Sequence, residues 1–274
     1  MKLLIAVDME GITGVTLPDH VNPAHPEYQR FRHLMTADVN AAIRGALEGG
    51  ATEIVVSDGH WDGNNILIEE LDPHARLNSG SPSPFSMVQG IDAGVQAVFF
   101  VGYHARIGTQ NAVQDHTWSS ARVANVWIND RIAGEIGLNA SLCGAFGAPV
   151  LLVTGDQSAG AEAQDWLPGV QTVAVKQATG RHAAECLPPV VSQARIHEAA
   201  RESLHRFVAG KGPAPLQPGT PVKMAIEFIY SDMADRASML PGANRLDGRT
   251  IEMTLPDMPT AYRTFRALVG LAAR

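Results

Sequence analysis

Short apolar runs recur along the first two thirds of the chain, and they do not alternate with polar residues. Uninterrupted runs of this kind are typical of parallel strands that are buried on both faces of a sheet. We predict such strands at Leu3–Val7, Glu53–Ser57, Ala97–Val101 and Val150–Thr154, with a weaker one at Thr172–Val175. A further strand is predicted at Arg122–Ile128.

Between these runs, apolar residues recur with the spacing of a helix face. The clearest case begins at Tyr28 and ends at Glu48, before the pair Gly49-Gly50, which is a common helix stop. Two further helices are predicted at Gly134–Phe146 and Ala159–Leu167. Strands and helices in alternation predict an α/β fold with a mostly parallel, doubly wound sheet flanked by helices.

After about residue 190 the pattern changes. A helix predicted at Ser192–Ala209 is followed by the Gly- and Pro-rich stretch GKGPAPLQPGTP, which is a candidate boundary. Beyond it we predict two strands and two helices, at Val222–Tyr230, Met233–Met239, Arg249–Leu255 and Met258–Ala273. We therefore expect an α/β domain at 1–190 and a smaller C-terminal α+β portion at 191–274.

Composition narrows the function classes. The 274 residues carry a net charge of -7 and 18% charged residues, so we expect neither nucleic acid nor a membrane as partner. Two cysteines, Cys143 and Cys186, make no disulfide framework, and each is expected to be a buried small apolar residue. The N-terminal apolar run is too short for a signal peptide, so we predict a cytoplasmic protein.

Polar residues follow three successive predicted strands at their carboxyl ends, where sites form in open α/β sheets. Asp8 and Glu10 follow the first strand, His60 follows the second, and His104 follows the third. Glu135 opens the helix after the turn at residues 129–130. Each residue alone has an ordinary structural explanation, such as a turn cap or a solvated side chain. Together they make a mixed nitrogen and oxygen ligand set that suits zinc, or manganese or cobalt.

Two metals that share one carboxylate would activate water near neutral pH and polarise a carbonyl, which is hydrolytic chemistry. Asp8 is the natural shared ligand, because it is short and follows the first strand directly. His116 then fits as a proton-transfer or nucleophilic group rather than a ligand. Asp58 and Asn139 are candidates for orienting a ligand or contacting substrate, and Asp58 could equally cap a turn. We expect Gly59 and Gly102 to let the backbone approach the site closely.

Two other interpretations use the same opening stretch, VDMEGITG. It resembles the D-x-D-G opening of Mg²⁺-dependent haloacid-dehalogenase-like phosphatases, although Glu10 stands where that family has Asp. The later segment TGDQSAG has Gly160 where the second Asp of that family's metal motif is expected. This alternative also leaves the histidines unused. A binding module that holds a sugar or a cation is the other alternative, and it would not need His116.

Several longer segments resemble the zinc D-aminopeptidase family of metallopeptidases, which includes a D-aminopeptidase of bacilli associated with dipeptide-transport operons. The segments that carry the resemblance are VDMEGITG, SDGHWDGNN, SGSPSPFSMVQGID, FFVGYHAR, INDRIAGEIGLNA, VLLVTGD, AVKQATGR, IEF and MLPG. They run from the first predicted strand into the C-terminal portion. The resemblance implies a dinuclear zinc aminopeptidase that acts on short peptides, preferably those that begin with a D-amino acid such as D-alanine.

The resemblance also implies roles for individual residues. The metal ligands of the family fall on Asp8, Glu10, His60, His104 and Glu135, with Asp8 bridging two Zn²⁺ ions per subunit, and the catalytic histidine falls on His116. The domain at 1–190 would then be the metal-binding catalytic domain. The resemblance implies a homo-oligomer, as a ring-based decamer around an inner chamber. A metal-dependent amidase that acts on a non-peptide amide would use the same ligands and stays an alternative.

Overall fold

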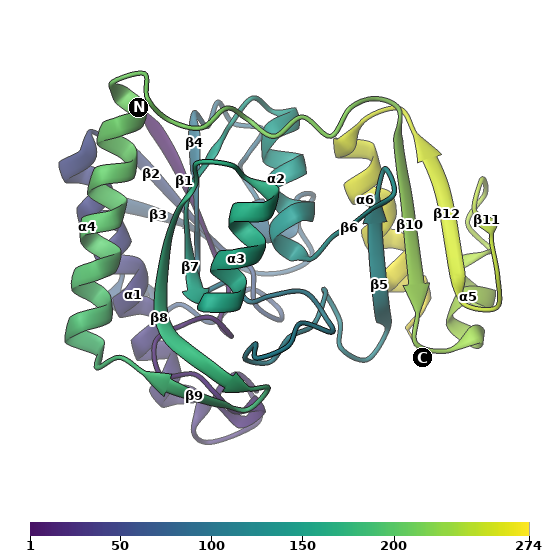
Figure 1. Cartoon of the computed structure of the whole chain (residues 1–274), viewed down its shortest axis with the longest axis horizontal. Helices are drawn as coiled ribbons and strands as arrows, with labels where there is room; N and C mark the ends of the chain where they lie inside the picture. Colours follow the sequence, from purple (N-terminus) through teal and green to yellow (C-terminus); the bar gives the residue numbers. More distant parts are fainter. Residues whose placement is uncertain (274) are drawn as a thin grey trace.

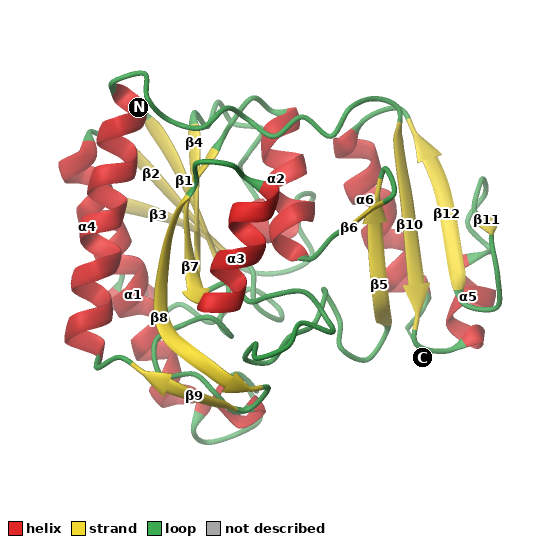
Figure 2. Cartoon of the chain, in the orientation of Figure 1, coloured by secondary structure: helices red, strands yellow, loops and turns green. Residues whose placement is uncertain are grey.

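The computed structural model describes residues 1–273, and its strands form two sheets within that range (Figures 1 and 2). Sheet A has the order β3-β2-β1-β4-β7-β8-β9, with every pair parallel except β8 and β9. Its strands are β1 (Lys2–Val7), β2 (Glu53–Asp58), β3 (Ala75–Asn78), β4 (Ala97–Val101), β7 (Val150–Asp156), β8 (Gln171–Gly180) and β9 (Ala183–Cys186). The predicted α/β class with a mostly parallel sheet is confirmed.

Sheet B is antiparallel throughout and has the order β11-β12-β10-β5-β6. Its strands are β5 (Val123–Ile128), β6 (Arg131–Ile132), β10 (Val222–Phe228), β11 (Asn244–Arg245) and β12 (Thr250–Leu255). Two of these strands, β5 and β6, come from the middle of the chain and join strands that come from its last quarter (Figure 1).

Helices cover both sheets. They are α1 (Tyr28–Gly49), α2 (Glu135–Ala145), α3 (Gln157–Trp166), α4 (Pro189–Val208), α5 (Ser231–Ala237) and α6 (Met258–Leu271). Helices α1 and α4 pack on each other beside sheet A, α2 and α3 lie on the side of that sheet that faces sheet B, and α6 lies on sheet B (Figure 2). Glycine permits the close contact of α1 and α4, because a Cβ on Gly45 would lie 2.1 Å from the carbonyl oxygen of His197.

Two hydrophobic clusters fill the interior. One lies between sheet A and the α1–α4 pair, and it includes Ile5 and Met35. The other runs from the opposite face of sheet A, at Phe100, through α2 to Ile226 and Phe265 of the sheet B layer. The predicted division at residue 190 stays a prediction. The layers of the structure do not coincide with this division. β5 and β6 of sheet B precede residue 190, and α4, which spans residue 190, packs on α1 of the sheet A layer.

The long elements match their predicted ranges within a few residues, except that β8 continues to Gly180 beyond its predicted end at Val175. The short strands β3, β6, β9 and β11 were not predicted. Cys143 is buried as expected, but the same expectation is wrong for Cys186, which is exposed at the end of the edge strand β9. No helix within residues 1–273 has the length and apolar character needed to cross a membrane.

Candidate metal centre

Three neighbouring strands deliver the predicted ligands to one edge of sheet A. β1 lies between β2 and β4, and Val7 is in register with Asp58 on one side and Val101 on the other. The residues that come after these strands therefore meet. Glu135 joins them from the first turn of α2. The structure thus brings together all five predicted ligands, each no more than 5% exposed: Asp8, Glu10, His60, His104 and Glu135.

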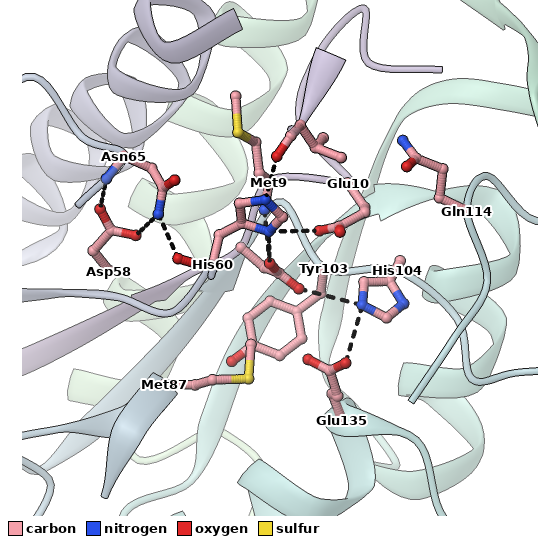
Figure 3. A network of polar contacts seen from close by, with 12 residues as sticks. Met9, Glu10, Asp58, His60, Asn65, Met87, Tyr103, His104, Gln114 and Glu135 are labelled. Carbon is pink, nitrogen blue, oxygen red and sulfur yellow. Dashed lines mark hydrogen bonds and ion pairs between the residues drawn. The ribbon is translucent and has the colours of Figure 1, made fainter. Parts of the chain in front are cut away.

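The carboxylate of Asp8 lies between two imidazoles. Its Oδ1 is 3.3 Å from His60 Nδ1, and its Oδ2 is 3.3 Å from His104 Nε2. Glu10 Oε2 lies 3.2 Å from the same nitrogen of His60, and Glu135 Oε1 lies 3.3 Å from that of His104. Figure 3 shows Glu10 pointing toward His60, and Glu135 pointing toward His104. The cluster therefore divides into two halves that share Asp8.

Each histidine of the cluster uses its other ring nitrogen to bond a backbone carbonyl. His60 Nε2 lies 2.8 Å from Val21 O, and His104 Nδ1 lies 2.9 Å from Ala105 O. Because a carbonyl only accepts hydrogen bonds, these nitrogens carry the proton in a neutral ring. The nitrogens that face the carboxylates, His60 Nδ1 and His104 Nε2, then present lone pairs, which is how proteins orient metal-binding histidines.

Two buried atoms at the centre of the cluster have no hydrogen-bond partner within residues 1–273. They are Glu10 Oε2 and His104 Nε2, although each lies within 3.3 Å of a polar atom across the cluster. Buried polar atoms normally have hydrogen-bond partners. Atoms that lie close together without hydrogen-bond geometry are expected where they share a bound ion as their partner. The donor atoms of Asp8, Glu10 and His60 lie within 4.8 Å of one another, as do those of His104, His116 and Glu135. Nitrogen and oxygen donors in this arrangement fit zinc.

Electrostatics in the cluster favour a cation. Burial alone would raise the pKa of Asp8, but His104 and His60 together hold it well below its ordinary value. Burial alone would lower the pKa of His60 and of His104, yet the facing carboxylates raise both well above the ordinary value. The negative charge of the carboxylates, which favours a proton on the imidazole nitrogens, also favours a divalent ion beside them. Binding of a metal ion would displace that proton.

Glycine allows the ligand loops to touch, as the sequence predicted. Gly102 has φ +75°, and a Cβ there would lie 2.3 Å from the carbonyl oxygen of Asp8. A Cβ on Gly59 would lie 2.8 Å from the carbonyl oxygen of Val7. Any larger residue at these positions would push apart the strand ends that carry the ligands.

A buried lysine that the sequence analysis missed holds the loop that carries Glu10. The ammonium of Lys176, on β8, donates to the carbonyl oxygens of Glu10, Ile12 and Val15 at 2.6, 2.9 and 2.7 Å. Its three donors are thus satisfied by one loop. Burial lowers the pKa of Lys176 to about 8. The available signal was a lysine directly after the apolar run at residues 173–175, because a lysine is rarely buried without a dedicated partner.

His116 lies beside the half of the cluster formed by His104 and Glu135. Its Nε2 is 3.7 Å from Glu135 Oε1, and its Nδ1 lies 2.9 Å from Gln114 O. Its ring stacks on that of His104 with centroids 4.1 Å apart. Its side chain is 17% exposed, in contrast to the deeply buried ligands. His116 therefore joins the predicted site while one edge of its ring stays open.

The loop around His116 is held from two sides. Gln114 and Trp118, two residues before and after it, both have positive φ, at +50° and +65°. The backbone N–H of Trp118 donates to Glu135 Oε1 at 2.7 Å, and its indole packs edge-on against Tyr262 and Phe265 of α6. The sheet B layer thus supports the loop. The spacing of residues along the sequence does not predict this contact.

Asp58 and Asn139, the two other residues predicted near the site, stabilise the structure around it. Asp58 accepts hydrogen bonds from the backbone N–H groups of Asn65 and Ile66 at 2.6 and 2.9 Å, so it fixes the loop after β2 rather than the ring of His60. Asn139 bonds the hydroxyls of Tyr103 and Tyr262 at 3.0 and 2.8 Å and so links the end of β4 to α6.

The cluster opens into a pocket of about 790 Å³. Asp8, Glu10, His116 and Glu135 are among the residues that line it. A pocket of this size holds a small organic ligand such as a short peptide.

Residues 1–267, nearly the whole chain, match the family described as D-aminopeptidase.

The chain belongs to the D-aminopeptidase family. A D-aminopeptidase of Bacillus subtilis is 38% identical over 275 aligned positions, which cover 100% of this chain and 98% of that protein. A solved structure described as the Zn-dependent D-aminopeptidase DppA from Bacillus subtilis, a self-compartmentalizing protease, matches with a TM-score of 0.95 and 37% identity. That match covers 100% of this chain and 98% of the other.

Membership of the D-aminopeptidase family confirms the resemblance identified in the sequence. It favours a metallopeptidase over the phosphatase and the binding module that the opening stretch also allowed. The geometry agrees, because both oxygens of Asp8 face imidazole nitrogens.

Proposed function

We propose that this chain is a dinuclear zinc aminopeptidase that removes the N-terminal residue from short peptides, preferably a D-amino acid such as D-alanine. The observation that carries the proposal is the position of Asp8, whose two oxygens face the imidazoles of His60 and His104 at equal distances of 3.3 Å. The similarity to a Zn-dependent D-aminopeptidase over the full chain supports zinc and the D-peptide substrate.

In this proposal Asp8 is shared by both ions, Glu10 and His60 complete the protein ligands of one, and His104 and Glu135 complete those of the other. Mn²⁺ or Co²⁺ could substitute, since the donors are nitrogen and oxygen. Bound zinc would polarise the scissile carbonyl and lower the pKa of coordinated water. The backbone carbonyls behind His60 and His104 keep both rings oriented.

His116 is the proposed catalytic residue. Its Nδ1 bonds Gln114 O, so in the neutral ring Nε2 carries a lone pair toward the pocket. That nitrogen can take a proton from the attacking group and return it to the leaving amine, or attack the carbonyl itself. The stacking on His104 and the backbone restraint by Trp118 hold the ring in place for either role.

We also propose a homo-oligomer, because the similar Bacillus subtilis protein is described as self-compartmentalizing. The family resemblance identified in the sequence is the basis for proposing a decamer. A chamber would admit short peptides and exclude folded proteins. Light scattering on the purified protein tests the decamer. The cytoplasm stays the proposed compartment, which agrees with two cysteines that are both free.

The test is the zinc content of the purified protein, together with hydrolysis of D-Ala-D-Ala and L-Ala-L-Ala before and after chelation. We expect about two zinc ions per chain and chelator-sensitive release of D-alanine alone. Bound zinc without cleavage of either peptide would instead favour an amidase that acts on a non-peptide amide. Cleavage that persists after complete removal of metal would overturn the proposal.

A further inference from the structure

Three arginines line the pocket, and the guanidinium groups of two of them form hydrogen bonds with other residues of the chain. Arg181 donates to a carboxylate oxygen and the backbone carbonyl of Asp115, at 2.9 and 3.2 Å. Arg266 donates to two backbone carbonyls of the loop at residues 83–84. The guanidinium of Arg122 differs from both, because it has no hydrogen-bond or ion-pair partner within the described chain.

The backbone of Arg122 is firmly held even though its side chain is free. Its N–H donates to Ser119 O at 3.0 Å, and its carbonyl accepts from the N–H of Ile229 at 2.9 Å. The residue directly precedes β5 and follows His116 by six positions. Sheet B therefore presents a partly buried, unpaired guanidinium from a fixed point to the same pocket that contains His116.

The other charges in the pocket do not neutralise Arg122. Three of the lining acids, Asp8, Glu10 and Glu135, are the proposed zinc ligands, and two zinc ions would more than offset their charge. The remaining acid, Asp62, is exposed and has no ion-pair partner in residues 1–273. A partly buried cation without a partner favours an anion in its pocket.

We infer that Arg122 binds the free α-carboxylate at the C-terminal end of the peptide substrate. This inference rests on the proposed aminopeptidase function and adds a specificity residue to it. A short peptide held by its N-terminal residue at the metals carries its carboxylate into the remainder of a pocket of about 790 Å³. The planar guanidinium matches a carboxylate with two parallel hydrogen bonds. The enzyme would thereby select short peptides with a free C-terminus.

The experiment compares D-Ala-D-Ala with its C-terminal amide, which lacks the negative charge. We expect the wild-type protein to show a lower KM for the acid. In Arg122→Ala, KM for the acid should rise roughly 10–100-fold, with kcat within about threefold and an unchanged KM for the amide. Arg122→Lys should recover part of the loss. Arg195→Ala removes an exposed, unpaired arginine outside the pocket and is the matched control.

Equal KM values for acid and amide in the wild-type protein would overturn the inference, and this comparison needs no variant. An equal effect of Arg122→Ala on both peptides would do the same, since it would indicate a structural role. In either case metal-dependent cleavage would leave the proposed function intact. If the zinc-loaded wild-type protein cleaves neither peptide, the proposed function fails and the inference fails with it.

Discussion

The rings of His104 and His116 stack with their planes 12° from parallel and their centroids 4.1 Å apart. One belongs to a proposed zinc ligand and the other to the proposed catalytic group. A zinc ion bound at His104 Nε2 would occupy the lone pair of that nitrogen, while His104 Nδ1 keeps its bond to Ala105 O. The stacked ring of His116 would then lie directly beside a metal-bound ring.

The first prediction separates catalysis from metal binding at His116. His116→Ala should retain about two zinc ions per chain, because the remaining ligands are intact, while kcat for D-Ala-D-Ala falls roughly 10²–10⁴-fold. Zinc content and steady-state rates are measured on the same sample. His205→Ala, an exposed histidine of α4, is the control and should keep full activity. Loss of one zinc ion from His116→Ala would make His116 a ligand instead.

The second prediction concerns the shared ligand. Asp8→Asn should lose most of both zinc ions, because the carboxylate between His60 and His104 contributes to each half of the cluster. Glu10→Gln should lose only one, since Glu10 faces His60 alone. Elemental analysis after dialysis against a fixed free zinc concentration distinguishes the two. Equal zinc content in both variants would contradict the sharing of Asp8.

The third prediction concerns Lys176. Replacement by Met leaves three buried carbonyls of the Glu10 loop without their donor. We expect the free energy of unfolding to fall by about 3 kcal/mol and zinc affinity to fall about 10–100-fold. Lys223→Met removes an exposed ion pair with Asp130 and should change neither quantity appreciably. Lower stability with unchanged zinc affinity would limit Lys176 to a structural role.

The fourth prediction is a pH dependence of stability. Burial raises the pKa of Asp38 from 3.8 to about 6, although the N–H of Thr13 donates to its carboxylate at 3.0 Å. The folded state therefore keeps this proton to higher pH than the unfolded state does. Asp38 should lower the free energy of unfolding progressively as pH rises from about 4 to 6, by up to about 3 kcal/mol, with no further change above.

Asp38→Asn removes that dependence. Urea unfolding of the metal-free protein at several pH values between about 4 and 8 measures it, as the difference between variant and wild type. The difference should grow in favour of the variant up to about pH 6 and then stay level. A difference that does not vary with pH would show that the carboxyl titrates alike in both states.

The clustering of the candidate ligands could be predicted from the sequence because its signal is local. Asp8, His60 and His104 each come just after a strand that is an apolar run, and neighbouring parallel strands bring the residues beyond their carboxyl ends to one edge of the sheet. The long helices and strands were also predicted from local signals, because the spacing of apolar residues within one segment indicates whether it is a helix or a strand. The family resemblance then gave these residues their proposed roles.

Contacts between distant segments could not be predicted in this way. The pairing of β5 with β10 joins residues about a hundred positions apart, and the sequence of neither strand predicts which strand it pairs with. Nor does any local pattern show that Lys176 reaches the loop of Glu10 or that Trp118 packs against Phe265. Short edge strands such as β9 are likewise set by tertiary pairing rather than by their own residues.

The pairing of β5 with β10 also sets an order of events during synthesis of the protein on the ribosome. When β5 emerges, its partner β10 and the helix α6 have not yet been made. The indole of Trp118 gains its contacts with Tyr262 and Phe265 only after translation has passed the C-terminal helix. The loop that carries His116 is thus fully supported only in a finished chain, so a nascent chain carries its proposed metal ligands before the proposed catalytic site is complete.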